Sequence, residues 1–154
     1  MGQEIESSHF SESDYREFSA RLKAETTLLG DMLSDDCKAT CFDDSNYVGG
    51  FELESWLIDR TGLPSASNEL FLQKLGSEDV VAELAKFNVE FNALPSILTG
   101  KIFSHMRSQL EELWLAGQAV ADEQETSLLA IGILPTVGQE ELVVDNMSAS
   151  ERYL

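Results

Sequence analysis

Three glutamates on two predicted strands form the set of residues in this sequence best suited to chemistry. Glu52 and Glu54 lie in the stretch 48–59, and Glu90 lies in 87–93. Because side chains alternate along a strand, Glu52 and Glu54 share one face and lie about 7 Å apart. If the two stretches pair, Glu90 joins them on that face, flanked by two asparagines. Oxygen ligands gathered in this way suit a hard cation such as Mg²⁺.

The solvent-exposed face of an antiparallel sheet is the alternative interpretation of these glutamates, because polar residues are ordinary there. Trp56 and Ile58 share the glutamate side by the same alternation, which argues against a fully wet face. Gly49 and Gly50 lie beside the carboxylates and would let a ligand or another backbone approach closely. Alternation alone leaves both interpretations open.

Hydrophobic spacing and turn residues predict the elements that position the glutamates. Strands are predicted where an alternating or continuous apolar pattern lies between turn signals: 47–59, 87–93 and 128–134. Pro95 and Pro135 are expected to end the second and third of these strands. Helices are predicted where apolar residues recur at helical spacing or where a serine offers a cap: 12–34, 67–75, 77–84 and 101–122. This order predicts an α+β fold, with an antiparallel or mixed sheet and helices packed on one face.

The sequence divides into an acidic N-terminal helix and loop, residues 1–46, and a second region, residues 47–154. Near the end of the chain, Ser148 and Glu151 have the spacing of a capping box, which predicts a helix beginning there. A single helical turn is not stable by itself. We therefore expect residues 47–154 to be the first part of a longer, truncated domain.

Charge excludes two classes of partner. With 10 Lys+Arg against 28 Asp+Glu the formal net charge is −18, which repels nucleic-acid phosphates and anionic lipid heads. A site for an anionic ligand would need a bound cation and basic groups supplied locally. Residues 1–20 are polar and acidic, unlike a secretory signal, so a cytoplasmic location is expected.

The glutamate motifs resemble a known family. GFELE at 50–54, followed by FNVEFN at 87–92 and Pro95, resembles the paired motifs of the glutamate-cysteine ligase family of carboxylate-amine ligases. Further similar segments follow in the same order: 131–136, 147–148 and 152–153. The resemblance covers residues 47–154 and implies a partial glutamine synthetase-like catalytic domain. Residues 1 to about 40 match nothing in that family.

The family resemblance implies a magnesium site and a reaction. In the family, carboxylates on the early strands hold Mg²⁺ ions that bridge the phosphates of ATP, and by position Glu52, Glu54 and Glu90 match them. Glu83 lies where some members carry another acidic ligand, and an exposed residue at the end of a short helix is the alternative. The implied reaction phosphorylates a glutamate side chain, and an amine such as that of cysteine then attacks the acyl phosphate, as in glutathione biosynthesis. Phosphate-binding residues are expected beyond Leu154, so this part alone is expected to be inactive.

A non-catalytic acidic module that binds a divalent cation or a basic protein is the second function that the sequence supports. The charge of −18 motivates it. The ligase would have amino acids and ATP as partners, whereas the module would have a cation or a protein. In either case, unpaired sheet edges and apolar surface on a truncated domain favour association between copies of the chain.

Overall fold

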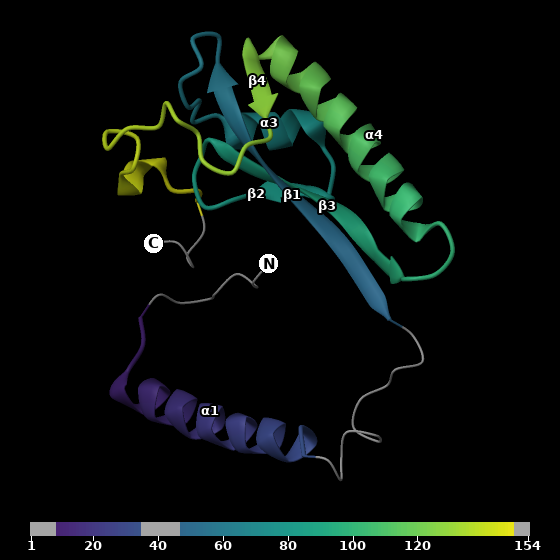
Figure 1. The fold of residues 1–154 in the computed structure, drawn as a ribbon. Coiled ribbons are helices and arrows are strands. Elements are labelled where there is room, and N and C mark those ends of the chain that lie inside the picture. The colour runs from purple at the N-terminus through teal and green to yellow at the C-terminus, as the bar shows by residue number, and fades with distance from the viewer. Residues whose placement is uncertain (1–8, 35–46, 150–154) are drawn as a thin grey trace. The chain divides into compact units, whose positions relative to one another are not determined.

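The computed structural model describes residues 9–34 and 47–149 of the 154-residue chain (Figure 1). The chain divides into two compact units, Met1–Tyr47 and Val48–Leu154. In the described part, the first unit holds helix α1 (Glu12–Met32), which confirms the helix predicted over 12–34. Its N-terminus is closed by a capping box, in which the Asp14 amide donates to Ser11 Oγ and the Ser11 amide donates to Asp14 Oδ2.

A four-stranded antiparallel sheet forms the second unit. Its strands are β1 (Val48–Asp59), β2 (Val80–Ala82), β3 (Asn88–Ile97) and β4 (Thr126–Leu129), in the order β2-β3-β1-β4. β1 is the long central strand, and it pairs with β3 along most of its length but with β4 only over Trp56–Asp59. The three predicted strands therefore lie in one sheet, and the expected α+β fold is confirmed.

Two helices cover one face of this sheet. They are α3 (Asn68–Leu75) and α4 (Ile102–Glu123). α4 was predicted from helical spacing. α3 was predicted from Ser67 as its cap, and Ser67 is the N-cap residue but its side chain makes no capping hydrogen bond. The core between helices and sheet is a single cluster of buried side chains: Leu57, Phe71, Val80, Val89, Phe91, Ala121 and Leu128. A short 3-10 helix, η1 (Val144–Asn146), belongs to the irregular segment that follows β4 and lies on the side of the sheet away from α4 (Figure 1).

Gly117 lets α4 approach the sheet closely. A Cβ atom built at this position would lie 3.0 Å from Leu128 Cδ1 and 3.2 Å from the ring of Phe91. Phe91 has no exposed surface, and its ring also lies against Trp114 with 5.6 Å between ring centroids. The absence of a side chain at Gly117 thus lets the backbone of α4 pack directly against Leu128 and Phe91 of the sheet.

The helix predicted over 77–84 is wrong, because this stretch contains strand β2. Val80, Val81 and Ala82 pair with Phe91, Glu90 and Val89 of β3. Val80 and Val81 are β-branched and favour a pleated strand, and Val80 is 3% exposed in the core. Ser77 accepts a hydrogen bond from the Asp79 amide in the turn before the strand, so it serves a turn and not a helix.

Two predicted strand ends are also wrong. β3 continues through Pro95 to Ile97. Pro95 lies between Ala93 and Ser96, at the irregularity where the register between β3 and β1 shifts, and a bulge of this kind tolerates a residue without an amide donor. β4 is shorter than the predicted 128–134 and ends at Leu129. Beyond it, the carbonyl of Ile131 accepts a hydrogen bond from Trp56 Nε1 at 3.0 Å, which holds that segment outside the ladder.

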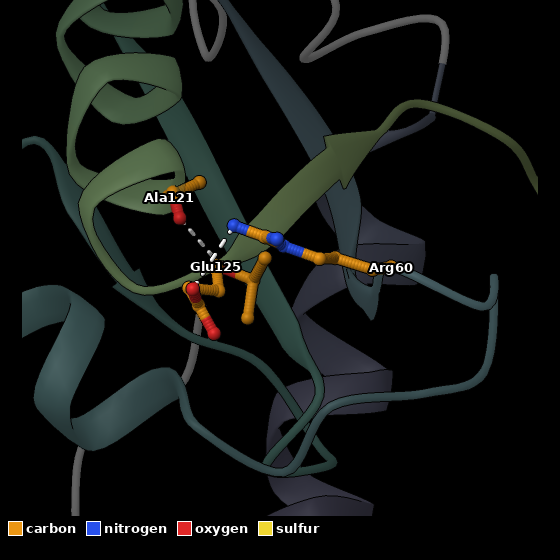
Figure 2. A network of polar contacts seen from close by, with 4 residues as sticks. Arg60, Ala121 and Glu125 are labelled. Carbon is orange, nitrogen blue, oxygen red and sulfur yellow. Dashed lines mark hydrogen bonds and ion pairs between the residues drawn. The ribbon is translucent and has the colours of Figure 1, made fainter.

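A tight turn joins α4 to β4. Glu125 in this turn has φ of 59°, a left-handed conformation that is uncommon for residues other than glycine. Figure 2 shows Arg60, which follows β1, reaching Glu125 with 3.0 Å between Arg60 Nη2 and Glu125 Oε1. The hydroxyl of Thr126 donates to the Ala121 carbonyl at 3.2 Å, so the turn is tied both to β1 and to the end of α4. The helix predicted to begin at Ser148 falls mainly on 150–154, outside the described residues.

Candidate metal centre

Glu54 and Glu90 lie directly opposite each other on β1 and β3. The Asn92 amide donates to the Asp79 carbonyl on the β2 side, so by alternation the backbone groups of Glu90 also point toward β2. Glu54 and Glu90 are therefore a non-hydrogen-bonded pair, in which Cα atoms lie about 4.5 Å apart and side chains come closest. Glu52 lies on the same face, opposite Asn92, as the alternation predicts.

Glu83 completes a cluster with this pair. One carboxylate oxygen from each of Glu54, Glu83 and Glu90 can be chosen so that all lie within 4.8 Å of one another. Glu54 is exposed, Glu83 is half-buried and Glu90 is 4% exposed. In the described part of the chain, none of the three forms an ion pair with lysine or arginine. Among the described residues, three carboxylates thus converge without a lysine or arginine partner.

The spacing of these oxygens suits a divalent cation. Oxygens bound to one ion lie at most twice the metal–oxygen distance apart, about 4.2 Å for Mg²⁺ and about 5 Å for Ca²⁺. A spacing within 4.8 Å fits Ca²⁺ directly and fits Mg²⁺ after a small side-chain rotation, which exposed Glu54 is free to make. The all-oxygen donor set is the one that both ions prefer.

Burial and neighbouring charge raise the pKa of Glu90 above its ordinary value. Removal of the carboxylate from water is the largest cause, and repulsion from Glu52 and Glu83 acts in the same direction. A hydrogen bond from Asn92 Nδ2 to Glu90 Oε1, 3.1 Å long, opposes the shift but does not cancel it. The metal-free site therefore favours the protonated form of Glu90, and a bound cation would favour the ionised form.

A buried polar network holds the backbone of Glu83. The Ser148 hydroxyl donates to the Glu83 carbonyl, and the Ser148 amide donates to the Leu84 carbonyl at 2.9 Å. Asn68 Nδ2 lies 3.0 Å from Ser148 Oγ and 3.2 Å from the Ala85 carbonyl. Asn68 and Ser148 are 1% and 2% exposed. The segment that carries Glu83 is therefore fixed by Asn68 and Ser148, which lie outside the carboxylate cluster.

Trp56 borders the carboxylate face, as its position on the glutamate side predicts. Its ring stacks on Phe87 with 5.4 Å between centroids and 7° between planes. Phe87 is 2% exposed and lies in the turn before β3, where its ring packs on Trp56. The face that carries the glutamates is therefore closed at one end by an aromatic pair and is not uniformly wet.

Gly50 is required by the backbone of a neighbouring strand. A Cβ atom there would lie 3.1 Å from the Ala93 carbonyl oxygen, at the irregularity where the register of β1 and β3 shifts. Gly50 was expected to allow close approach either of a ligand or of another backbone. The contact with Ala93 accounts for the glycine by the second of these, without a ligand.

The structure brings together three of the four predicted ligands, Glu54, Glu83 and Glu90, and leaves Glu52 outside the cluster. Sequence patterns missed the role of Asn68 and Ser148 in holding the backbone of Glu83. Ser148 carries two sequence signals, the capping-box spacing with Glu151 and its place in a segment similar to the ligase family, and neither indicates this role. Comparison of the chain with protein-family models, with characterised proteins and with solved structures found no match. No helix in the described residues combines the length and apolarity needed to cross a bilayer.

Proposed function

We propose that this chain carries the cation-binding face of an ATP- and Mg²⁺-dependent ligase, which joins a glutamate-type carboxylate to an amine such as that of cysteine. The convergence of Glu54, Glu83 and Glu90 is the observation that carries the proposal. Their order along the chain is the order of the acidic positions in the ligase motifs. The antiparallel sheet would be the first part of a glutamine synthetase-like catalytic domain, working on cytoplasmic ATP and amino acids.

The three carboxylates would hold Mg²⁺, which neutralises phosphate oxygens and the charge that develops as a phosphoryl group is transferred. Such an ion keeps several coordination positions for water and phosphate and uses few protein carboxylates. Asn92 would keep the Glu90 carboxylate oriented by its hydrogen bond, and Ser148 would keep Glu83 in reach. The chain's own charge of −18 repels ATP, so a cation at this face is what would allow phosphate to approach.

A non-catalytic acidic module that binds a divalent cation is the second candidate, because the same cluster supports it without any nucleotide. The two candidates differ in what ATP does to the cation. In the ligase, phosphates add ligands to an ion already held by glutamates, so ATP strengthens its binding. In the module, ATP only removes the ion from the protein.

Electron paramagnetic resonance of Mn²⁺ separates the two candidates on the chain itself. We expect the protein to retain Mn²⁺ when ATP is added, with a spectrum that differs from those of free Mn²⁺-ATP and of the ATP-free complex. Glu90→Gln should lose this signal, and Glu112→Gln, an exposed glutamate in the middle of α4, should keep it. Transfer of all Mn²⁺ to free ATP, also from a polypeptide that carries the phosphate-binding residues expected beyond Leu154, would favour the module. In a polypeptide that extends this chain, Glu90→Gln should also abolish Mg²⁺-dependent release of ADP in the presence of glutamate and an amine.

A further inference from the structure

β1 has an open edge beside the place where β4 stops. The Leu57 amide donates to the Phe87 carbonyl on the β3 side, so by alternation the backbone groups of Trp56, Glu54 and Glu52 point to the opposite side. β4 lies on that side but pairs only with Trp56–Asp59. In the part of the chain that the structure describes, no strand pairs with the outward backbone groups of Glu52 and Glu54. Unpaired donors and acceptors of this kind are a template for an added strand.

We call the open edge of β1 at Glu52 and Glu54, next to the end of β4, the lane. An apolar groove lies beside it, on the core-facing side of β1. It has a volume of about 600 Å³ and is bordered by the core-facing side of β1, by α4 and by Ala130, the residue after β4. Its apolar lining includes Phe51, Leu53, Phe103, Trp114 and Leu115. Arg107 and Glu111, which form an ion pair with each other on α4, also border it. Phe51, Phe103 and Leu115 are 47%, 60% and 65% exposed. Exposed apolar side chains gathered in one groove commonly mark a binding surface.

The other face of the lane is acidic. Glu52 and Glu54 project from β1 on the side away from the groove, and Glu52 takes no part in the carboxylate cluster. A strand placed in the lane would alternate between these two environments. Every second side chain would enter the apolar groove, and the ones between would lie directly opposite Glu52 and Glu54, within about 5.5 Å of them.

We infer that this lane binds an extended segment of a partner protein in which apolar and basic residues alternate. The segment runs antiparallel to β1, as β4 does in the same lane, and places its basic side chains against Glu52 and Glu54. A second copy of the chain fits less well. Pairing two β1 edges would set the same two glutamates of each copy on one face, between molecules that each carry a charge of −18.

The probe is a blocked seven-residue peptide that alternates lysine with valine, titrated into the 154-residue chain and followed by calorimetry. We expect it to bind and expect the matched glutamate–valine peptide not to bind. In the antiparallel arrangement the lysine amides face β1 and the valine amides face solvent. N-methylation of two lysine amides should therefore weaken binding about thirtyfold, if each hydrogen bond contributes about 1 kcal/mol, and N-methylation of two valine amides should leave it nearly unchanged.

Variants of the chain separate the lane from general attraction between charges. Glu52→Lys should weaken the lysine–valine peptide about tenfold. Glu69→Lys, at an exposed site on α3, should change affinity less than about threefold, because screening reduces attraction between distant charges. Leu115→Asp should also weaken binding, since it places a charge in the groove. Lack of binding by the lysine–valine peptide, equal effects of the two N-methylated sets, or a chain dimer that Leu115→Asp dissociates would each overturn the inference.

Discussion

Replacing Glu90 by glutamine should stabilise the metal-free protein. Glutamine keeps the oxygen that accepts from Asn92 Nδ2, so the substitution removes the charge but not that hydrogen bond. Two like charges 4.8 Å apart repel by about 0.9 kcal/mol in water. Repulsion from Glu54 and Glu83 together then amounts to about 2 kcal/mol, which screening at physiological salt reduces to about 1 kcal/mol. For a unit of this size, we expect the melting temperature to rise by about 5 °C.

Magnesium should reverse the order of stability. A cation that binds only the folded state at a hundred times its dissociation constant adds about 2.7 kcal/mol to the unmutated protein. The Glu90→Gln protein should lose most of that gain. Thermal unfolding followed by near-ultraviolet circular dichroism, with EDTA or with MgCl₂, measures both effects, and NaCl at equal ionic strength is the control for screening.

Glu112→Gln provides the matched variant, because Glu112 is an exposed α4 residue outside the cluster. If Glu90→Gln shifts the melting temperature no more than Glu112→Gln does, the carboxylates are ordinary surface groups. If MgCl₂ acts no more strongly than NaCl on the unmutated protein, the cluster is no cation site.

Three further predictions follow from the same structure. The pKa of Glu90 is raised in the folded state, so the metal-free protein should lose stability as pH rises from the ordinary carboxyl range through that raised pKa. Urea unfolding at a series of pH values measures this loss, and Glu90→Gln should make it smaller. Ser148→Ala should lower the free energy of unfolding by about 1–3 kcal/mol, because the carbonyl of Glu83 loses its donor. It should also reduce the rise in melting temperature that Mg²⁺ causes. An unchanged rise would show that Ser148 stabilises the fold and does not contribute to cation binding. Gly117→Ala should lower the free energy of unfolding, because its methyl group would press on the buried ring of Phe91. This contact should cost about 1–3 kcal/mol, more than the gain of about 1 kcal/mol in helix propensity. Equal or greater resistance to urea would show that Phe91 and Leu128 shift to make room for the methyl group.

The long elements were predictable from the sequence because each carries its own pattern. β1 and the start of β3 alternate over several residues, and α4 shows a continuous apolar stripe over 22 residues. The shared face of Glu52, Glu54 and Glu90 follows from the same alternation once two strands pair. β2 was not predictable, since a strand of three residues has too few positions for a period. Its state is decided by pairing with β3.

The remainder of the site depends on contacts that no local pattern contains. Glu83 reaches the cluster only because β2 runs beside β3. Asn68 and Ser148 are 80 positions apart in sequence, and their hydrogen bond forms only when the segment after β4 returns to the start of α3. The end of β4 at Leu129 likewise depends on the indole of Trp56, which holds the carbonyl of Ile131 away from the ladder. Such polar contacts depend on tertiary placement and leave no periodic signal.

The register between β1 and β3 places like charges opposite each other, and this has a consequence for how the chain folds. A slip of two residues that set Glu54 against Asn92 would keep every side chain on its face of the sheet. It would place Trp56, and no carboxylate, opposite Glu90. The bulge at Gly50, pressed against the Ala93 carbonyl, fits only one alignment and opposes that slip. A divalent cation present during folding would favour the same alignment, because only there do three carboxylates meet. Refolding with and without Mg²⁺ would then differ in the fraction of molecules that reach the native register, and the cation would act as a template for the sheet before it serves any ligand.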